Sequence, residues 1–127
     1  MKIKVFVLGN PIVKDDSLPL SLLPALRKKL PEINFITFDP SEELVIENYE
    51  KIIIVDTVIN SPKVIQFNNL NQWTVSPRVT LHDYDLPLSL GIMKKLGKLK
   101  ELKIIGVPSS GNKKEILNQI IALLKAI

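Results

Sequence analysis

The sequence predicts an α/β fold, a three-layer sandwich in which a mainly parallel, twisted sheet of about five strands carries helices on both faces. Apolar runs of strand length at residues 3–8, 51–55 and 103–107 are separated by segments with helical spacing. Strand and helix therefore alternate along the chain, which favours parallel pairing. A length of 127 residues predicts a single domain spanning residues 1–127.

The first elements follow from apolar periodicity and its interruptions. Residues 3–8 are β-branched and apolar and end at Gly9, as a buried strand does. Four leucines at helical spacing predict a helix over residues 20–30, which either begins near Ser21 or is kinked at Pro24. Residues 33–38 then read as a second strand.

The middle of the chain predicts one central strand and several shorter elements. Ser41 is expected to cap a short helix. Residues 51–55 form a continuous apolar run after Lys51, typical of a strand buried on both faces, and Asp56 is expected to end it. Residues 64–67 and 72–75 are interpreted as a hairpin or an excursion at the sheet edge.

Two helices and a strand complete the prediction. Asp85 is positioned to cap a helix that stops at Gly97, and residues 103–107 form the last strand. Asn112 and Glu115 have the spacing of a capping box at the start of the final helix. The apolar stripe predicted for this helix consists of Ile116, Ile120, Leu123 and Ile127.

Composition excludes several classes of protein. Hydrophobic residues make up 46% and charged residues 24% of the chain, as in ordinary globular proteins. The absence of cysteine excludes disulfides, thiolate metal sites and cysteine nucleophiles, and leads us to expect a cytoplasmic protein. The apolar run at the N-terminus is too short for a signal peptide, and no run approaches the roughly 20 residues of a membrane span. We therefore expect no membrane insertion.

The net charge of +4 comes largely from lysines at helix ends and in residues 94–100. Aromatic residues make up 6% of the chain and are scattered, and no nucleic-acid-binding motif accompanies the lysines. We interpret the charge as solvated helix faces and expect no nucleic-acid partner.

Three ionisable side chains are the candidate site: Asp16, Asp56 and His82. Each follows a predicted strand or precedes a predicted helix, and such positions converge on one edge of the sheet in α/β proteins. Two carboxylates and an imidazole suit a borderline divalent ion such as nickel or zinc, whereas calcium and magnesium favour oxygen ligands alone.

Each member of the trio also has a structural interpretation. Asp56 can cap the turn that follows it, and one aspartate of the Asp15–Asp16 pair can cap a helix, in which case Asp16 is assigned to the cleft. His82 is the single histidine, and a lone histidine is often a packed or surface residue. The conjunction of all three at one predicted edge is what favours a metal site.

Other common sites find no support. The turn at residues 9–11 lacks the glycine pattern of a dinucleotide-binding or Walker loop, and no Gly-x-Ser-x-Gly elbow accompanies the histidine. Residues 109–112 could bind an anion at the start of the last helix, although simple capping explains them.

The ordered motifs resemble the hydrogenase maturation endopeptidases, which trim the carboxyl terminus of the large subunit of NiFe hydrogenases. The resemblance runs over nearly the whole chain. Its motifs are Val7-Leu8-Gly9-Asn10-Pro11 with Asp15-Asp16, Ile54-Val55-Asp56-Thr57-Val58, Leu81-His82-Asp83, and Ile104-Ile105-Gly106-Val107-Pro108.

The resemblance implies that Asp16, Asp56 and His82 form the metal-contacting and catalytic site. It also implies that the metal is nickel carried by the substrate, the precursor of a NiFe hydrogenase large subunit, although other divalent ions can occupy the site in vitro. The endopeptidase would then act as a monomer on a metal-loaded precursor.

Two segments depart from the family pattern. Ser17-Leu18-Pro19 replaces the usual Gly-x-Gly stretch after the acidic pair, and residues 39–43 replace a glycine-rich segment after the second strand. This form resembles the branch that acts on archaeal hydrogenases, and the composition fits a thermophile.

Two alternatives remain open. The lost glycines are compatible with a noncatalytic binding module or an inactive family member. A receiver-like signalling domain also carries an acidic pair after its first strand and an aspartate at the end of its third. Here, however, the last strand ends in Val107-Pro108-Ser109, with no lysine at the position where receivers carry one.

Overall fold

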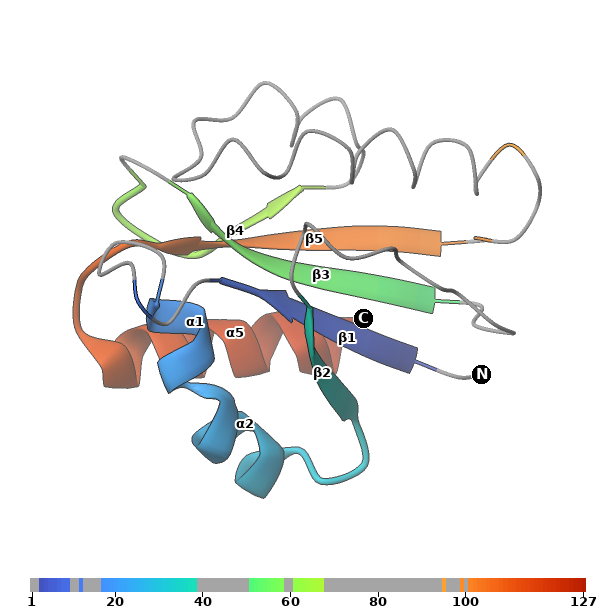
Figure 1. Ribbon diagram of the computed structural model, residues 1–127, viewed down its shortest axis with the longest axis horizontal. Coiled ribbons are helices and arrows are strands. Elements are labelled where there is room, and N and C mark those ends of the chain that lie inside the picture. The colour runs from blue at the N-terminus through green and yellow to red at the C-terminus, as the bar shows by residue number, and fades with distance from the viewer. Residues whose placement is uncertain are drawn as a thin grey trace.

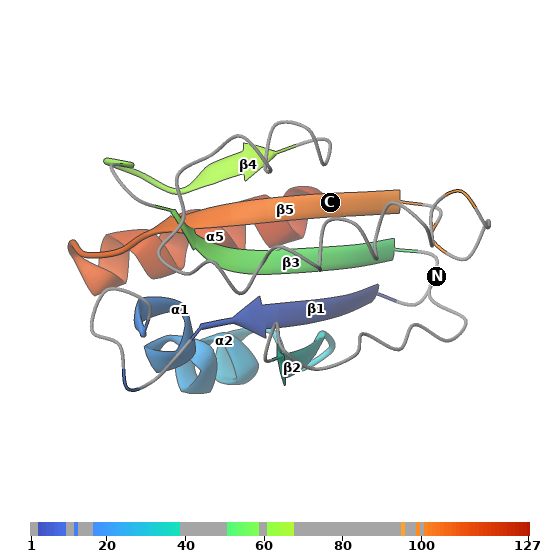
Figure 2. The same cartoon turned by 45° about the horizontal axis from the view of Figure 1, so that its top comes forward.

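The computed structural model describes residues 3–9, 12, 17–38, 51–58, 61–67, 95, 99 and 101–127. These residues form one sheet with the strand order β2-β1-β3-β5-β4 (Figures 1 and 2). Its strands are β1 (Ile3–Leu8), β2 (Asn34–Phe38), β3 (Lys51–Val58), β4 (Ile65–Phe67) and β5 (Glu101–Pro108). The helices are α1 (Leu18–Ser21), α2 (Leu23–Lys29) and α5 (Lys113–Ala126).

The sheet is mainly parallel, as the alternation of strands and helices predicts. β1 lies between β2 and β3, and β3 pairs with β5 along its whole length, all in parallel. β4 is antiparallel to β5 and forms one edge. The arrows of β1, β3 and β5 therefore point to the same carboxyl edge of the sheet (Figure 1).

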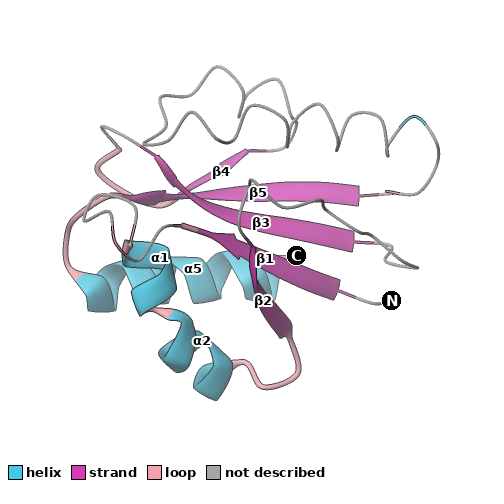
Figure 3. Cartoon of the chain, viewed as in Figure 1, coloured by secondary structure: helices cyan, strands magenta, loops and turns pink. Residues whose placement is uncertain are grey.

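α1, α2 and α5 cover one face of the sheet (Figure 3). Alternate strand residues such as Val5, Ile53 and Ile105 point into this layer and are almost completely buried. They pack against the leucines of α1 and α2 and the isoleucines of α5. We call this the helix-covered face.

The intervening strand residues form a second apolar cluster on the opposite face. Phe6, Ile52 and Ile104 belong to it and are 4% exposed or less. Burial of both faces explains the continuous apolar runs, because a parallel strand in the middle of such a sheet has no solvent-facing side. This second cluster is called the opposite face below.

The α/β fold is confirmed, while several predicted elements lie outside the described residues. These are the helix capped by Ser41, the second hairpin strand at residues 72–75, and most of the helix between Asp85 and Gly97. Of the helix predicted between Asp85 and Gly97, the structure describes Lys95 alone, which is helical and exposed. The strand at residues 64–67 is confirmed as the edge strand β4, paired with β5.

The helix predicted over residues 20–30 is two short helices. α1 ends at Ser21 and α2 begins at Leu23, with Leu22 between them. Each helix has a proline in its first two positions, where the missing N–H costs no helical hydrogen bond. Pro24 therefore lies in the first turn of a helix, as the first predicted arrangement has it, but that helix begins at Leu23 and a separate short helix precedes it.

β3 does not end at Asp56, contrary to prediction. It continues through Thr57 and Val58, which pair with Val107 and Pro108 of β5. The ladder uses backbone groups, so a charged side chain does not stop it where the neighbouring strand is long enough to pair. All eight residues of β3 are buried.

α5 begins at the predicted cap. The side chain of Asn112 accepts a hydrogen bond from the Glu115 N–H, at 3.1 Å between Oδ1 and N. The apolar stripe needs one correction, because Leu124 is buried along with Ile116 and Ile120, whereas Leu123 is half-buried. The buried positions follow a spacing of four, which keeps them on one side of the helix.

Replacing Asn112 with alanine should lower the free energy of unfolding by about 1 kcal/mol, because the Glu115 N–H loses its capping acceptor. Urea unfolding followed by circular dichroism measures the loss. The exposed Ser110→Ala change is the control and should cost much less. Equal stability of wild type and the Asn112→Ala variant would show that the cap is energetically silent.

None of the described helices is both long enough and apolar enough to cross a lipid bilayer.

Candidate active site

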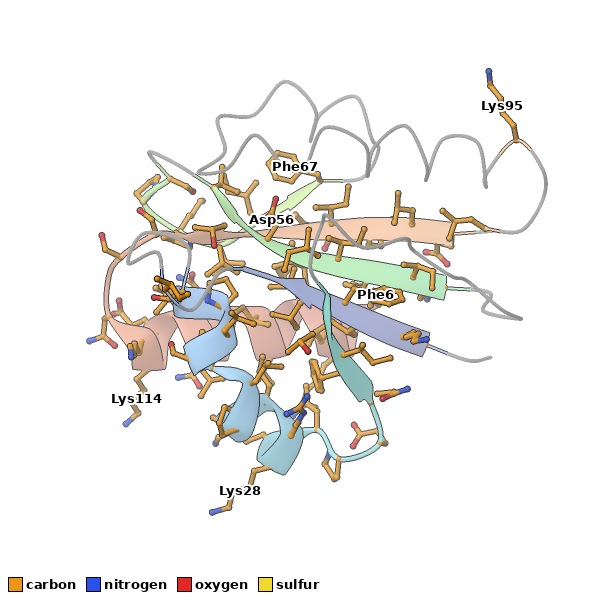
Figure 4. All side chains as sticks on the ribbon, in the orientation of Figure 1. Phe6, Lys28, Asp56, Phe67, Lys95 and Lys114 are labelled. Atoms are coloured by element: carbon orange, nitrogen blue, oxygen red, sulfur yellow. The ribbon has the colours of Figure 1, made fainter. Side chains whose placement is uncertain are left out.

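Asp56 is the member of the candidate trio that the structure describes. It lies in β3, two residues before this central strand ends at Val58, and pairs in register with Gly106 of β5. Its side chain alternates with Val55 and Thr57, so it belongs to the same face as Ile54. Figure 4 shows it on the side of the sheet away from α5. The residue is 3% exposed, as expected for a carboxylate after an apolar strand.

A backbone hydrogen bond orients this carboxylate. The Thr57 N–H donates to Asp56 Oδ1 at 2.9 Å. A hydrogen bond to an ionised acceptor is stronger than one between neutral groups. The bond therefore stabilises the charged form and holds the carboxylate against the carboxyl end of β3.

Among the described residues, those that pack beside Gly106, the in-register partner of Asp56, on the opposite face are apolar and close together. A Cβ placed on Gly106 would lie 2.9 Å from Cε2 of Phe67 and closer still to Cγ2 of Val58. Position 106 therefore has no room for a side chain, because Val58 and Phe67 occupy the space that a Cβ would take. Asp56 and Phe67 lie on the same side of the sheet in Figure 4, so an aromatic ring from β4 borders the aspartate's side of the site.

Thr57 and Gly106 stand in the sequence motifs and Phe67 in a predicted strand, but none of the three was assigned a role of its own. A glycine inside the apolar run at residues 103–107 was the available signal, because glycine within a buried strand often marks a close approach by another group. The partners of that approach depend on strand register, which apolar periodicity does not specify.

The Thr57 hydroxyl is buried on the helix-covered face. Its Oγ1 is the one buried side-chain polar atom without a hydrogen-bond partner in the described part of the chain. Leaving such a group unpaired costs roughly 1–3 kcal/mol. The Thr57 N–H therefore donates to Asp56, whereas the Thr57 hydroxyl has no hydrogen-bond partner in the described part of the chain.

Asp16 and His82 lie outside the described residues, so their placement beside Asp56 stays a prediction. No cluster of three potential metal-ligating side chains occurs among the residues that the structure does describe. β1, the strand that precedes Asp16 in the chain, nevertheless ends beside the Asp56 part of β3. Val7 pairs with Val55, so the next residues of these strands, Leu8 and Asp56, are neighbours at the carboxyl edge.

An ion pair lies at the amino-terminal end of β3 and β5, away from Asp56. Lys51 Nζ lies 3.4 Å from Glu101 Oε2, and these two residues begin β3 and β5 in register. The lysine is buried and the glutamate side chain is 43% exposed. This ion pair joins the first residues of β3 and β5, at the end of the sheet away from Asp56.

The molecule is thus an α/β protein with a buried, oriented carboxylate at the carboxyl edge of its central strand. Solved structures show what such a chain is similar to. It is similar to the hydrogenase maturating endopeptidase HybD from E. coli, with a TM-score of 0.72 and 17% identity over 99% of this chain and 93% of that one.

Two further structures have the same fold. Hydrogenase 2 maturation peptidase from Thaumarchaeota archaeon SCGC_AB-539-E09 gives a TM-score of 0.59 at 21% identity, covering 98% of this chain and 95% of that one. An uncharacterized protein from Wolinella succinogenes gives 0.61 at 14% identity, covering 98% and 97%. The resemblance found in the sequence motifs is confirmed at the level of the fold.

The likeness lies in the fold rather than in close sequence relationship. No protein-family model and no curated protein matches the sequence.

Proposed function

We propose that this chain is an endopeptidase that removes the carboxyl-terminal extension from the nickel-loaded precursor of a NiFe hydrogenase large subunit. The observation that carries the proposal is the coincidence of two independent features. The fold matches hydrogenase maturation peptidases over nearly the whole chain, and the aspartate that the motif resemblance assigns to the site is buried and oriented at the carboxyl edge of the sheet.

In this proposal the nickel belongs to the substrate. Asp16, Asp56 and His82 contact it, and the precursor supplies the remaining ligands. The chemistry of the donor set fits, because carboxylate oxygen and imidazole nitrogen suit a borderline divalent ion. The bond from the Thr57 N–H to Asp56 Oδ1 would fix the direction from which the ion is approached.

Hydrolysis of the scissile peptide bond needs an activated water. A divalent ion lowers the pKa of bound water and polarises a carbonyl oxygen. Asp56 or Asp16 would accept the proton from the attacking water and deliver it to the leaving amine. The products are the shortened subunit with a new carboxylate and the released extension with a new amino terminus.

Cleavage of the precursor tests the proposal. The purified chain is incubated with nickel-loaded precursor from the same organism, and the intact mass of the precursor is measured. One discrete loss of mass from its carboxyl terminus is the expected result. An unchanged mass with the correct partner would favour a noncatalytic relative, the alternative that the missing glycines after Asp16 keep open.

The receiver-like alternative is disfavoured by topology. Doubly wound domains of that kind have the parallel strand order 2-1-3-4-5. In this chain the last strand, β5, lies directly beside β3, and the edge strand β4 is antiparallel. Labelling of Asp56 by a small phosphodonor would reverse this judgement.

A further inference from the structure

Phe67 is an aromatic residue of the edge strand β4 whose ring lies over the neighbouring strand β5. A Cβ placed on Gly106 would lie 2.9 Å from Cε2 of Phe67, so the edge of the ring occupies the place of the missing side chain. Phe67 itself pairs with Ile104, two residues before Gly106. The ring therefore extends along β5 toward the carboxyl edge of the sheet, on the opposite face.

Gly106 is the residue of β5 that lies beside Asp56. The two are partners in the register of β3 and β5, and neighbouring strands lie roughly 5 Å apart. Because glycine has no side chain, it would leave the β5 side of Asp56 open. The ring of Phe67 and Cγ2 of Val58 fill that space instead. Figure 4 shows the ring and the aspartate on the same side of the sheet.

The segment that carries Phe67 is fixed to both faces of the sheet. The Val64 N–H donates to Oε1 of Gln119 on α5, at 3.1 Å between N and Oε1. Val64 is buried in the cluster of the helix-covered face, and Phe67 is buried in the cluster of the opposite face. These contacts explain how β4, a strand of three residues, holds its aromatic ring in one place over β5.

We propose that Phe67 is a positioning residue for Asp56, and that its ring keeps the carboxylate from turning into the space over Gly106. The inference rests on the proposed function, because it takes the direction of this carboxylate to govern the rate of cleavage. The Thr57 N–H holds Oδ1 at 2.9 Å, and the ring limits the other orientations of the same side chain. A shift of about 1 Å in a reacting group can lower a rate by roughly 10²-fold.

The test compares Phe67→Leu with Phe67→Met and with Leu102→Ala. Leucine lacks an atom equivalent to Cε2, which lies over Gly106, whereas methionine has a similar volume and a longer side chain that can fill this space. Leu102 is buried on the same face near the start of β5, so its truncation controls for a general loss of apolar contacts.

We expect Phe67→Leu to lower the kcat of precursor cleavage about tenfold. KM should stay within about twofold of wild type, because the buried ring orients the aspartate and makes no contact with substrate. Phe67→Met and Leu102→Ala should keep a kcat near the wild-type value at a temperature where all variants are folded. A rise of KM at unchanged kcat, or an equal fall of kcat in Leu102→Ala, would overturn the positioning role.

Hydrogen exchange separates this inference from the proposed function. The exchange rate of the Thr57 amide, compared with the other amides of β3, reports on the bond to Asp56 without reference to cleavage. Selectively faster exchange of Thr57 in Phe67→Leu, but not in Phe67→Met or Leu102→Ala, supports the positioning role even if wild type cleaves nothing, which would overturn only the peptidase proposal. Unchanged Thr57 exchange and unchanged kcat in folded Phe67→Leu would overturn the positioning role alone.

Discussion

Replacement of Asp56 by asparagine should reduce precursor cleavage by roughly 10²–10⁴-fold, the range for loss of a group that transfers a proton. Asparagine has the shape of aspartate and its side-chain oxygen can still accept the Thr57 N–H bond. It lacks the negative charge and the basicity that the proposed nickel contact and proton transfer would use. The measurement is the rate at which precursor of intact mass disappears.

The same variant should keep the fold. Because size and the Thr57 hydrogen bond are retained, the unfolding temperature should stay within about 5 °C of wild type. Asp56→Ala removes the acceptor as well and leaves the Thr57 N–H to find another partner, so it is expected to be both inactive and less stable. A fully active, stable Asp56→Asn variant would exclude Asp56 from the chemistry.

Glu101→Gln is the matched control. It makes the same carboxylate-to-amide change on β5, at the far end of the sheet from Asp56 and beside Lys51. We expect the cleavage rate to be unchanged, whatever the cost in stability. A loss of activity equal to that of Asp56→Asn would indicate that the assay reports sheet integrity and not the site.

Gly106→Ala should destabilise the protein by about 1–3 kcal/mol, the usual cost of overpacking a close-packed interior. The new methyl group would lie 2.9 Å from Cε2 of Phe67 and would also overlap Val58, so both side chains must shift. Val58 belongs to the central strand and is 3% exposed, which leaves it little room to move. Equilibrium unfolding in urea gives the change in free energy.

A double-mutant cycle with Val58→Ala assigns the cost to this contact. Val58→Ala opens a cavity and is destabilising by itself, but it removes Cγ2, the atom nearest the new methyl group. The double variant should therefore be more stable than the sum of the two single changes predicts, by roughly 0.5–3 kcal/mol. Strict additivity, or a Gly106→Ala variant as stable as wild type, would contradict the packing described here.

Periodicity was sufficient to predict most of the described fold, because each face of the sheet and each helix buries its own regular set of residues. The parallel strands of residues 3–8 and 51–55, and the final helix with its Asn112 cap, are the clearest examples. The end of β3 was not predictable in this way. Thr57 and Val58 extend the strand because Val107 and Pro108 are there to pair with them, some 50 residues later in the chain.

The candidate site also has features that the sequence predicts and features that depend on residues distant in the chain. Position after an apolar run was enough to place Asp56 in a buried setting at the carboxyl edge. The face it occupies, the Thr57 N–H that orients it and the ring of Phe67 beside Gly106 depend on strand register and on close packing. Asp16 and His82 lie outside the described residues, so their convergence with Asp56 rests on their predicted positions at the sheet edge and on the motif resemblance.

The most direct test of the central proposal compares two forms of the same precursor. Nickel-loaded and nickel-free large-subunit precursor are incubated separately with the wild-type protein, and the intact mass of each is measured over time. If Asp16, Asp56 and His82 recognise nickel carried by the substrate, only the loaded form loses its carboxyl-terminal extension. Equal processing of both forms, or an unchanged mass of the loaded form, would contradict the account.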